Sequence, residues 1–211
     1  MTLLVSAKNL TIGYSKNYPV ISGINLDIRT GDRIAVTGGN GSGKTTLIKT
    51  ISGLLEKISG ELFISKKKRV SMVPQIKNVR LHFPVTVKDA ILMPEENFFW
   101  KNRKFSETEM VLLEKLGLNG LLKKQLKECS GGQIQKTLLA RSVISRPSLI
   151  ILDEPLDALD ISSQKTVYSV LEDADITKDT AVITITHNIY SENMSFYKKI
   201  YEASEGLLRE K

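Results

Sequence analysis

Residues 38–45 constrain this chain more than any other segment, because they read Gly-Gly-Asn-Gly-Ser-Gly-Lys-Thr and fit the pattern of a phosphate-binding loop. The loop follows an apolar run, Arg33–Thr37, and precedes a helical pattern over Lys44–Leu54. Glycines let successive backbone N–H groups face phosphate oxygens, and the helix N-terminus adds partial positive charge. We expect Lys44 to reach the β- and γ-phosphates and the Thr45 hydroxyl to bind Mg²⁺. A glycine-rich turn that matches by chance is the alternative.

A second motif is an apolar strand that ends in two carboxylates, since residues 149–154 read Leu-Ile-Ile-Leu-Asp-Glu. A buried strand would bring Asp153 to the same sheet edge as the phosphate loop, where it could hold Mg²⁺ directly or through water. Strand alternation would send Glu154 the other way, free to activate a water molecule aimed at the terminal phosphate. Taken alone, the run also fits a strand that ends in solvated acids.

Strand and helix patterns alternate along most of the chain. Apolar residues alternate with polar ones over 24–28, which predicts a half-buried antiparallel strand. Uniformly apolar runs predict parallel strands buried on both faces: Arg33–Thr37, Leu149–Asp153 and Ala181–Thr186. Helical patterns lie between them: Lys44–Leu54, Gln133–Ser145 and Ser163–Leu171. This alternation predicts an α/β core.

The segment 76–132 differs, because strand patterns fade there and helical patterns dominate. Ser106-Glu107-Thr108-Glu109 is a capping-box pattern before the apolar-periodic Val111–Leu116, and Gly117 is placed to end that helix. We interpret 76–132 as a helical subdomain inserted into the α/β core of a single domain that spans 1–211.

Composition limits the compartment and the partners. The single cysteine, Cys129, excludes an internal disulfide, and the sequence lacks both a signal-peptide pattern and an apolar run long enough to cross a bilayer, so we expect a cytoplasmic chain. The net charge of +7 fits a solvated basic surface, binding of anionic nucleotides or lipid headgroups, or binding of nucleic acid. The basic run Lys66–Arg69 has no interleaved aromatic residues, so we interpret it as a solvated turn.

The order of the motifs resembles a known family. Cys129-Ser130-Gly131-Gly132-Gln133, which precedes the acidic strand, is by itself a helix start capped by Ser130, and also a second glycine-rich helix N-terminus suited to phosphate. The phosphate loop, Val73-Pro74-Gln75, Ser-Gly-Gly-Gln, Asp-Glu-Pro, Ala158-Leu159-Asp160 and His187 occur in the order found in ABC transporter ATPases. The resemblance covers residues 3–208, and Ser-Gly-Gly-Gln separates this family from other P-loop proteins.

The resemblance implies an α/β fold with a P-loop NTPase core, an N-terminal antiparallel β-subdomain and the inserted helical subdomain. It also implies that the chain binds ATP and Mg²⁺ and hydrolyses the ATP. The implied nucleotide-binding residues are Tyr14, Gly38, Gly39, Asn40, Gly41, Ser42, Gly43, Lys44, Thr45, Thr46, Ser130, Gly131, Gly132 and Gln133. The implied catalytic residues are Glu154, His187 and Gln75, and the implied Mg²⁺ ligands are Thr45, Gln75 and Asp153.

Two of these assignments have plainer alternatives. Tyr14 matches the aromatic residue that stacks on adenine, but aromatic contacts are common and it could be an ordinary strand tyrosine. His187 matches the histidine that contacts the γ-phosphate, but a histidine at a strand end could simply be a surface residue. Gln75 matches the glutamine that contacts Mg²⁺ or the attacking water and joins the core to the helical subdomain.

The resemblance also implies partners. Ser130–Gly132 match the signature that binds the γ-phosphate of a partner subunit's ATP, and Asp160 matches a loop that meets the opposite subunit. This implies an ATP-dependent homodimer with two sandwiched ATP molecules. The dimer would work with integral membrane permease subunits and an extracytoplasmic substrate-binding protein. The chain would lie on the inner face of the cell membrane and bind no nucleic acid.

The run Phe83–Met93 is similar to the corresponding segment in ATPases of zinc, manganese and iron importers, although its Thr86 could merely cap the next helix. With two histidines, His82 and His187, one cysteine and no zinc-site spacing, the chain itself is not expected to bind the transported ion. The chain departs from the family at Cys129, where Leu is usual, at Leu156-Asp157, where Thr-Ser or Asn-Ser is commoner, and at Met93-Pro94-Glu95, where metal importers commonly have Met-Gly-Arg. Asp157 adds a charge close to the dimer contact and so brings the strength of dimerisation into question. Pro94-Glu95 brings into question the local surface that couples the chain to its membrane partner.

Other functions compete with metal import. The chain could energise an exporter, or it could be an ABC ATPase that acts on nucleic acid or ribosomes, although such proteins usually have two cassettes or a coiled-coil insertion. A binding module without hydrolysis is opposed by the presence of both Glu154 and His187. The aromatic cluster Phe98-Phe99-Trp100 either packs within the helical subdomain or receives a helix of the membrane subunit.

Overall fold

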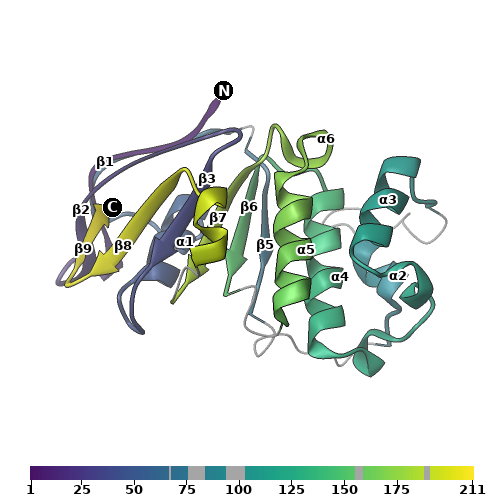
Figure 1. The fold of residues 1–211 in the computed structure, drawn as a ribbon. Coiled ribbons are helices and arrows are strands. Elements are labelled where there is room, and N and C mark those ends of the chain that lie inside the picture. The colour runs from purple at the N-terminus through teal and green to yellow at the C-terminus, as the bar shows by residue number, and fades with distance from the viewer. Residues whose placement is uncertain (67, 76–83, 94–102, 155–158, 188–190) are drawn as a thin grey trace. The chain divides into compact units, whose positions relative to one another are not determined.

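Figure 1 shows the computed structural model of the chain, which describes residues 1–66, 68–75, 84–93, 103–154, 159–187 and 191–211. The chain divides into two units. The first comprises Met1–Val70, Pro147–Glu154 and Asp179–Lys211, and the second comprises Ser71–Arg146 and Pro155–Lys178. Strand β5 (Val70–Val73) crosses from the first unit into the second.

Three strands of the first unit form an antiparallel sheet in the order β2-β1-β4. Their bounds are Leu3–Ser15 for β1, Tyr18–Arg29 for β2 and Ser59–Ile64 for β4. In β2, the side chains of Ile24, Leu26 and Ile28 are buried, whereas Asn25 and Asp27 between them are exposed. The half-buried antiparallel strand predicted from the alternation is therefore confirmed.

The remaining strands of the first unit follow the order β6-β7-β3-β8-β9. Their bounds are Arg33–Thr37 for β3, Leu149–Asp153 for β6, Ala181–Thr186 for β7, Lys199–Ser204 for β8 and Leu207–Glu210 for β9. Strand β3 pairs in parallel with β7 and β8, β6 pairs in parallel with β7, and β9 runs antiparallel to β8 (Figure 1). The three apolar runs predicted to be buried parallel strands are buried except at their last residues. Because parallel strands end at the same edge, β3, β6 and β7 bring Thr37, Asp153 and Thr186 to one edge.

Helix α1 (Lys44–Ser52) follows β3 and the glycine-rich loop. It ends two residues before the predicted end at Leu54, because Gly53 takes a left-handed conformation with φ 85°. The backbone N–H of Gly53 donates to Thr50 O at 3.0 Å, and that of Leu54 donates to Lys49 O at 2.8 Å. These bonds satisfy carbonyls at the helix end and turn the chain away from the helix axis.

The second unit is mainly helical in its described residues. Its α-helices are α2 (Val87–Leu92), α3 (Glu107–Lys115), α4 (Gly131–Ile144), α5 (Ile161–Glu172) and α6 (Ala174–Thr177). Single 3₁₀ turns occur at Asn119–Leu121 and Leu126–Glu128, and a 3₁₀ segment of the first unit spans Ser191–Phe196. The limits 76–132 of the inserted subdomain stay a prediction.

Side-chain caps fix where three of these helices begin. Thr86, Ser106 and Ser130 are N-caps of α2, α3 and α4, each in a reciprocal capping box. The capping box predicted at Ser106 and the cap predicted at Ser130 are confirmed. Thr86 also caps its helix, which is the alternative interpretation of that residue. Gly117, with φ 69°, follows the end of α3 as predicted.

No described helix combines the length and the apolar run that crossing a bilayer requires.

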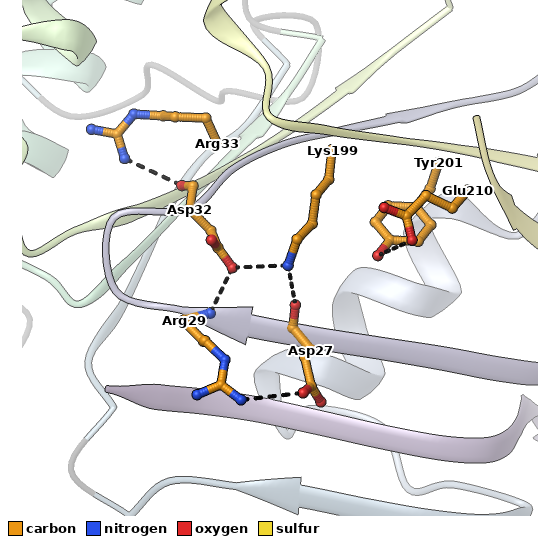
Figure 2. A network of polar contacts seen from close by, with 7 residues as sticks. All are labelled: Asp27, Arg29, Asp32, Arg33, Lys199, Tyr201 and Glu210. Atoms are coloured by element: carbon orange, nitrogen blue, oxygen red, sulfur yellow. Dashed lines mark hydrogen bonds and ion pairs between the residues drawn. The ribbon is translucent and has the colours of Figure 1, made fainter. Parts of the chain in front are cut away.

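A network of polar contacts joins the two sheets of the first unit at the start of β3 (Figure 2). The Asp32 carboxylate accepts from the Arg29 backbone N–H at 2.8 Å and lies 3.4 Å from Lys199 Nζ on β8, which also donates to Asp27 O on β2. The buried Arg33 guanidinium donates to Thr180 O at 2.6 Å. The network holds the amino ends of β3, β7 and β8, which leaves the opposite strand ends for the glycine-rich loop.

The basic run 66–69 differs in part from the expected solvated turn. Lys66 and Arg69 are exposed, but Lys68 is partly buried and its Nζ donates to Ile51 O in the last turn of α1. Burial lowers the pKa of Lys68 to about 8. The prediction was wrong at Lys68, because the turn lies against the end of α1 and an ammonium can bond the free carbonyls there.

The lowered pKa of Lys68 predicts a pH-dependent effect of Lys68→Met on stability. Its folded-state pKa, about 8, lies below its ordinary value of 10.5, so between these pH values the unfolded chain binds more protons and the free energy of unfolding rises with pH. Methionine removes this buried charge. The free energy of unfolding of Lys68→Met, compared with that of wild type, should therefore be highest below about pH 8. This difference should decrease as the pH approaches 10.5.

Urea denaturation of both proteins at a series of pH values measures this difference. The exposed Lys66→Met is the matched control, and its difference from wild type should not vary with pH. A Lys68→Met difference that stays constant across the series would contradict the burial of the ammonium.

Candidate functional site

Three glycines of the phosphate loop occupy positions at which a residue with a side chain would be strained or would clash. Gly38, Gly41 and Gly43 have φ values of 148°, 77° and 96°, which L-residues rarely adopt. A Cβ on Gly38 would lie 2.3 Å from Ala203 O, and one on Gly43 would lie 2.7 Å from Val20 Cγ1. The loop is therefore packed closely against β8 and β2, and its backbone can line the site without side chains in the way.

Two features of this loop fit an anion. Gly43 is the N-cap of α1, and no side chain of the N-cap residue accepts a hydrogen bond from the N–H groups at this positive helix end. The Ser42 Oγ is buried and has no hydrogen-bond partner among the described residues. A phosphate oxygen would give this hydroxyl the acceptor that it lacks.

Lys44 places a cation inside the loop. Its side chain is largely buried, and Nζ donates to Gly38 O and Gly39 O, both at 2.8 Å. Burial lowers the pKa of Lys44, and the negative charges of Glu154 and Asp153 oppose this shift. The ammonium is thus held between carbonyl dipoles and two carboxylates at the edge where β3 and β6 end.

Asp153 is the acidic end of β6 and is partly desolvated. Burial raises its pKa, the neighbouring Glu154 raises it further, and Lys44 and His187 oppose the shift. A carboxylate in this position is stabilised by a nearby divalent cation, and oxygen ligands are the ones that Mg²⁺ prefers. The described residues therefore fit both the phosphates and a magnesium ion.

Glu154 does not continue the strand as expected from alternation. Its φ is 45°, its backbone N–H donates to Ile185 O on β7 at 3.0 Å, and β6 ends one residue earlier. A non-glycine residue in this conformation stores about 1–3 kcal/mol of strain. The left-handed turn, rather than alternation, sets the direction of the carboxylate.

The Glu154 side chain is not free, in contrast to the expectation from the sequence. Its Oε1 lies 2.5 Å from His187 Nε2, and His187 Nδ1 lies 3.2 Å from Gly38 O. A carbonyl oxygen only accepts, so Nδ1 carries a proton, and a hydrogen bond at the other nitrogen needs a second proton between Nε2 and Oε1. The two contacts use both ring nitrogens of His187. His187 therefore connects the phosphate loop to Glu154.

Other predicted nucleotide residues also belong to the first unit. Tyr14 is at the end of β1 and is 64% exposed, and the Lys49 ammonium lies 5.8 Å from the centroid of its ring. Asn40 and Thr45 are exposed, whereas Thr46 is buried with 4% exposure. Sequence reasoning missed Lys49, although its spacing of four residues from Thr45 on α1 puts the two on the same helix face.

The predicted residues of the second unit are placed within that unit. Gln75 is partly buried just after β5, and Asp160 is the N-cap of α5. Gly131, Gly132 and Gln133 form the first turn of α4, whose exposed N-cap is Ser130. Cys129 is partly buried, and burial raises the pKa of its thiol. Several predictions lie outside the described residues: those on His82, Phe83, Pro94-Glu95, Phe98-Phe99-Trp100 and Leu156-Asp157.

The packing of the loop predicts different outcomes for two neighbouring glycines. In Gly38→Ala the new Cβ would meet Ala203 O, so we expect a loss of about 1–3 kcal/mol or more in the free energy of unfolding. A Cβ on Gly39 would have no atom within 4 Å, so Gly39→Ala should change the free energy of unfolding by less than about 1 kcal/mol. Urea denaturation without nucleotide measures both, and equal stabilities would contradict this account of the loop.

Comparisons with known proteins agree with the motifs. Residues 21–157 match the family described as ABC transporter. The zinc import ATP-binding protein ZnuC of Wigglesworthia glossinidia brevipalpis is 37% identical over 190 residues, which cover 90% of this chain and 78% of that protein. ZnuC of Haemophilus influenzae is 31% identical over 188 residues, covering 89% of this chain and 67% of that protein.

Solved structures give the same result. The inward-facing structure of a putative metal-chelate type ABC transporter has a TM-score of 0.80 and 29% identity, covering 100% of this chain and 83% of that one. The ADP form of an ATP-binding cassette of an ABC transporter has a TM-score of 0.78 at 23% identity, with 100% and 91% coverage, which shows the shared fold. The chain therefore belongs to the ABC transporter family, as a subunit that binds and hydrolyses ATP.

Proposed function

We propose that the chain supplies the energy of ATP hydrolysis to an importer of a metal ion, with zinc, manganese and iron as the candidates. The observation that carries this choice is the 37% identity, over 90% of the chain, to a protein named for zinc import. The 29% identity to a transporter described as metal-chelate type supports the same class. The run 83–93, which resembles the corresponding segment of zinc, manganese and iron importers, agrees with this class.

The phosphate loop would bind the β- and γ-phosphates of ATP. Lys44 Nζ would exchange the carbonyls of Gly38 and Gly39 for phosphate oxygens, because an ammonium bonds a negatively charged oxygen more strongly than a neutral carbonyl oxygen. The Ser42 hydroxyl would gain an acceptor, and the N-terminus of α1 would face the negative charge.

Asp153 and Thr45, both in the first unit, would hold Mg²⁺. A part for Gln75, which the family resemblance implies, stays a prediction. The raised pKa of Asp153 supports its part, because a cation relieves the cost of a desolvated carboxylate beside Glu154. Thr45 contributes an exposed hydroxyl in the first turn of α1. When bound, Mg²⁺ supplies neutralisation of the charge on the phosphate oxygens.

Glu154 would act as the general base that takes a proton from the attacking water. Its contact with His187 supports this role, since the pair fixes the carboxylate at the edge that carries the phosphate loop. His187, anchored at Gly38 O, would sense the γ-phosphate and orient the water. The phosphoryl group passes to water, and the released proton goes to the Glu154 carboxylate.

A second copy of the chain would complete each site. Ser130 and the first turn of α4 form an exposed helix start, which suits the γ-phosphate of ATP bound to the partner. The resulting homodimer would drive integral membrane permease subunits from the inner face of the cell membrane. An extracytoplasmic substrate-binding protein would deliver the ion.

Within the described residues, no group of three or more His, Cys, Asp or Glu side chains is arranged to hold a metal ion. Selection of the ion is assigned, in this proposal, to the other subunits. Export, or action on nucleic acid or ribosomes, remains the alternative, and the likeness to an ATP-bound exporter at 19% identity shows only the fold.

Metal uptake by cells that lack the chain tests the proposal. Uptake of labelled zinc, manganese or iron should fall, and the wild-type gene should restore it. Glu154→Gln should bind ATP but hydrolyse it about 100-fold more slowly or worse, and so fail to restore uptake. Glu56→Gln, at an exposed position, is the matched control and should restore it.

Unchanged uptake of all three ions would contradict metal import. A rise in the cellular content of one ion would instead indicate export. Restoration of uptake by Glu154→Gln would contradict its role as the base.

A further inference from the structure

Lys49 makes a contact that the proposed mechanism does not use. It lies in the last turn of α1, and its Nζ is 5.8 Å from the centroid of the Tyr14 ring at the end of β1. This distance is within the range of a cation–π interaction. Both residues belong to the first unit and are exposed.

The backbone around Lys49 fixes where this ammonium starts. The Lys49 carbonyl accepts from the N–H groups of Leu54 and Leu55 at 2.8 and 3.1 Å, at the helix end that Gly53 closes. Lys49 is thus held in a defined helix end rather than in a fraying one. Among the described residues, the Lys49 ammonium has no carboxylate partner, so its recorded interaction is with the ring.

Lys49 also lies on the face of α1 that carries Thr45. Thr45 and Lys49 are exposed, and the three residues between them, Thr46, Leu47 and Ile48, are buried. One turn of helix, about 5–6 Å, separates the two along the axis. The same helix therefore presents one residue to the phosphate end of the site and another to the ring of Tyr14.

We propose that Lys49 is a positioning residue that holds the Tyr14 ring ready to stack on the base of the bound nucleotide. The inference rests on the proposed ATP-binding function, and in particular on the adenine-stacking role that the family resemblance implies for Tyr14. An exposed tyrosine otherwise samples several rotamers, and ordering it on binding costs affinity. The ammonium lies over the ring, the Tyr14 side chain is 64% exposed, and the base would take the face opposite the ammonium. Because the ring would stack only on a base, Lys49 would strengthen the binding of nucleotides and leave the binding of a triphosphate without a base unchanged.

Binding titrations with two probes test this inference. A non-hydrolysable ATP analogue carries the base, whereas inorganic tripolyphosphate has only the phosphates. Lys49→Met should weaken binding of the analogue about two- to five-fold, the size of an exposed cation–π interaction, and leave tripolyphosphate unchanged. Lys49→Arg should bind the analogue as wild type does, because arginine also forms this interaction.

A double-mutant cycle with Tyr14→Ala shows whether the effect passes through the ring. In the Tyr14→Ala background, Lys49→Met should cause no further loss of affinity for the analogue. Lys16→Met, in the β1–β2 turn beside Tyr14, is the control for lost positive charge and should bind both probes as wild type does.

Four results would overturn the inference. Equal weakening of both probes by Lys49→Met would show that the lysine acts as a general charge on phosphates. An undiminished effect of Lys49→Met in the Tyr14→Ala background would show that it does not act through the ring. If Tyr14→Ala changed the affinity for neither probe, both the inference and the role of Tyr14 on which it rests would fail. If Tyr14→Ala weakened binding of the analogue but Lys49→Met did not, only the inference would be overturned.

Discussion

The site depends on the parallel pairing of β7 with both β3 and β6. This pairing aligns Thr37 with Thr186 and Asp153 with Ile185, so segments far apart in the sequence end at one edge. The phosphate loop, the two carboxylates and His187 all follow directly from these strand ends. The network at the opposite end, where Arg33 donates to Thr180 O, ties β3 to the start of β7. Burial of the apolar strand residues stabilises the pairing, and the polar groups are left for the open edge.

Charge balance at this edge explains why its residues occur together. Burial raises the pKa of Asp153, and the neighbouring Glu154 raises it further. Lys44 and His187 oppose that shift. Lys44 and His187 also each contact a carbonyl of the phosphate loop, Gly38 O. The arrangement is therefore a connected set, in which movement of the loop on binding phosphate would be felt by the carboxylates.

Local rules predicted much of this fold from sequence. Apolar runs gave β3, β6 and β7, and the capping residues gave the starts of α3 and α4, because these patterns act over a few neighbouring residues. The features that escaped prediction depend on tertiary packing. Lys68 is buried because its turn meets the end of α1, and Glu154 adopts φ 45° because its N–H bonds Ile185 O on a neighbouring strand. The contact of Lys49 with Tyr14 likewise joins a helix to a distant strand.

The central claim is that this edge hydrolyses ATP in partnership with a second copy of the chain. The most direct measurement is phosphate release by the purified chain, with ATP and with or without Mg²⁺, over a range of protein concentrations. The account predicts release that requires Mg²⁺ and a rate per chain that rises with protein concentration, because in the proposed homodimer each site would need Ser130–Gln133 of a partner. Release that does not need Mg²⁺, or a rate per chain that is the same at every concentration, would contradict it.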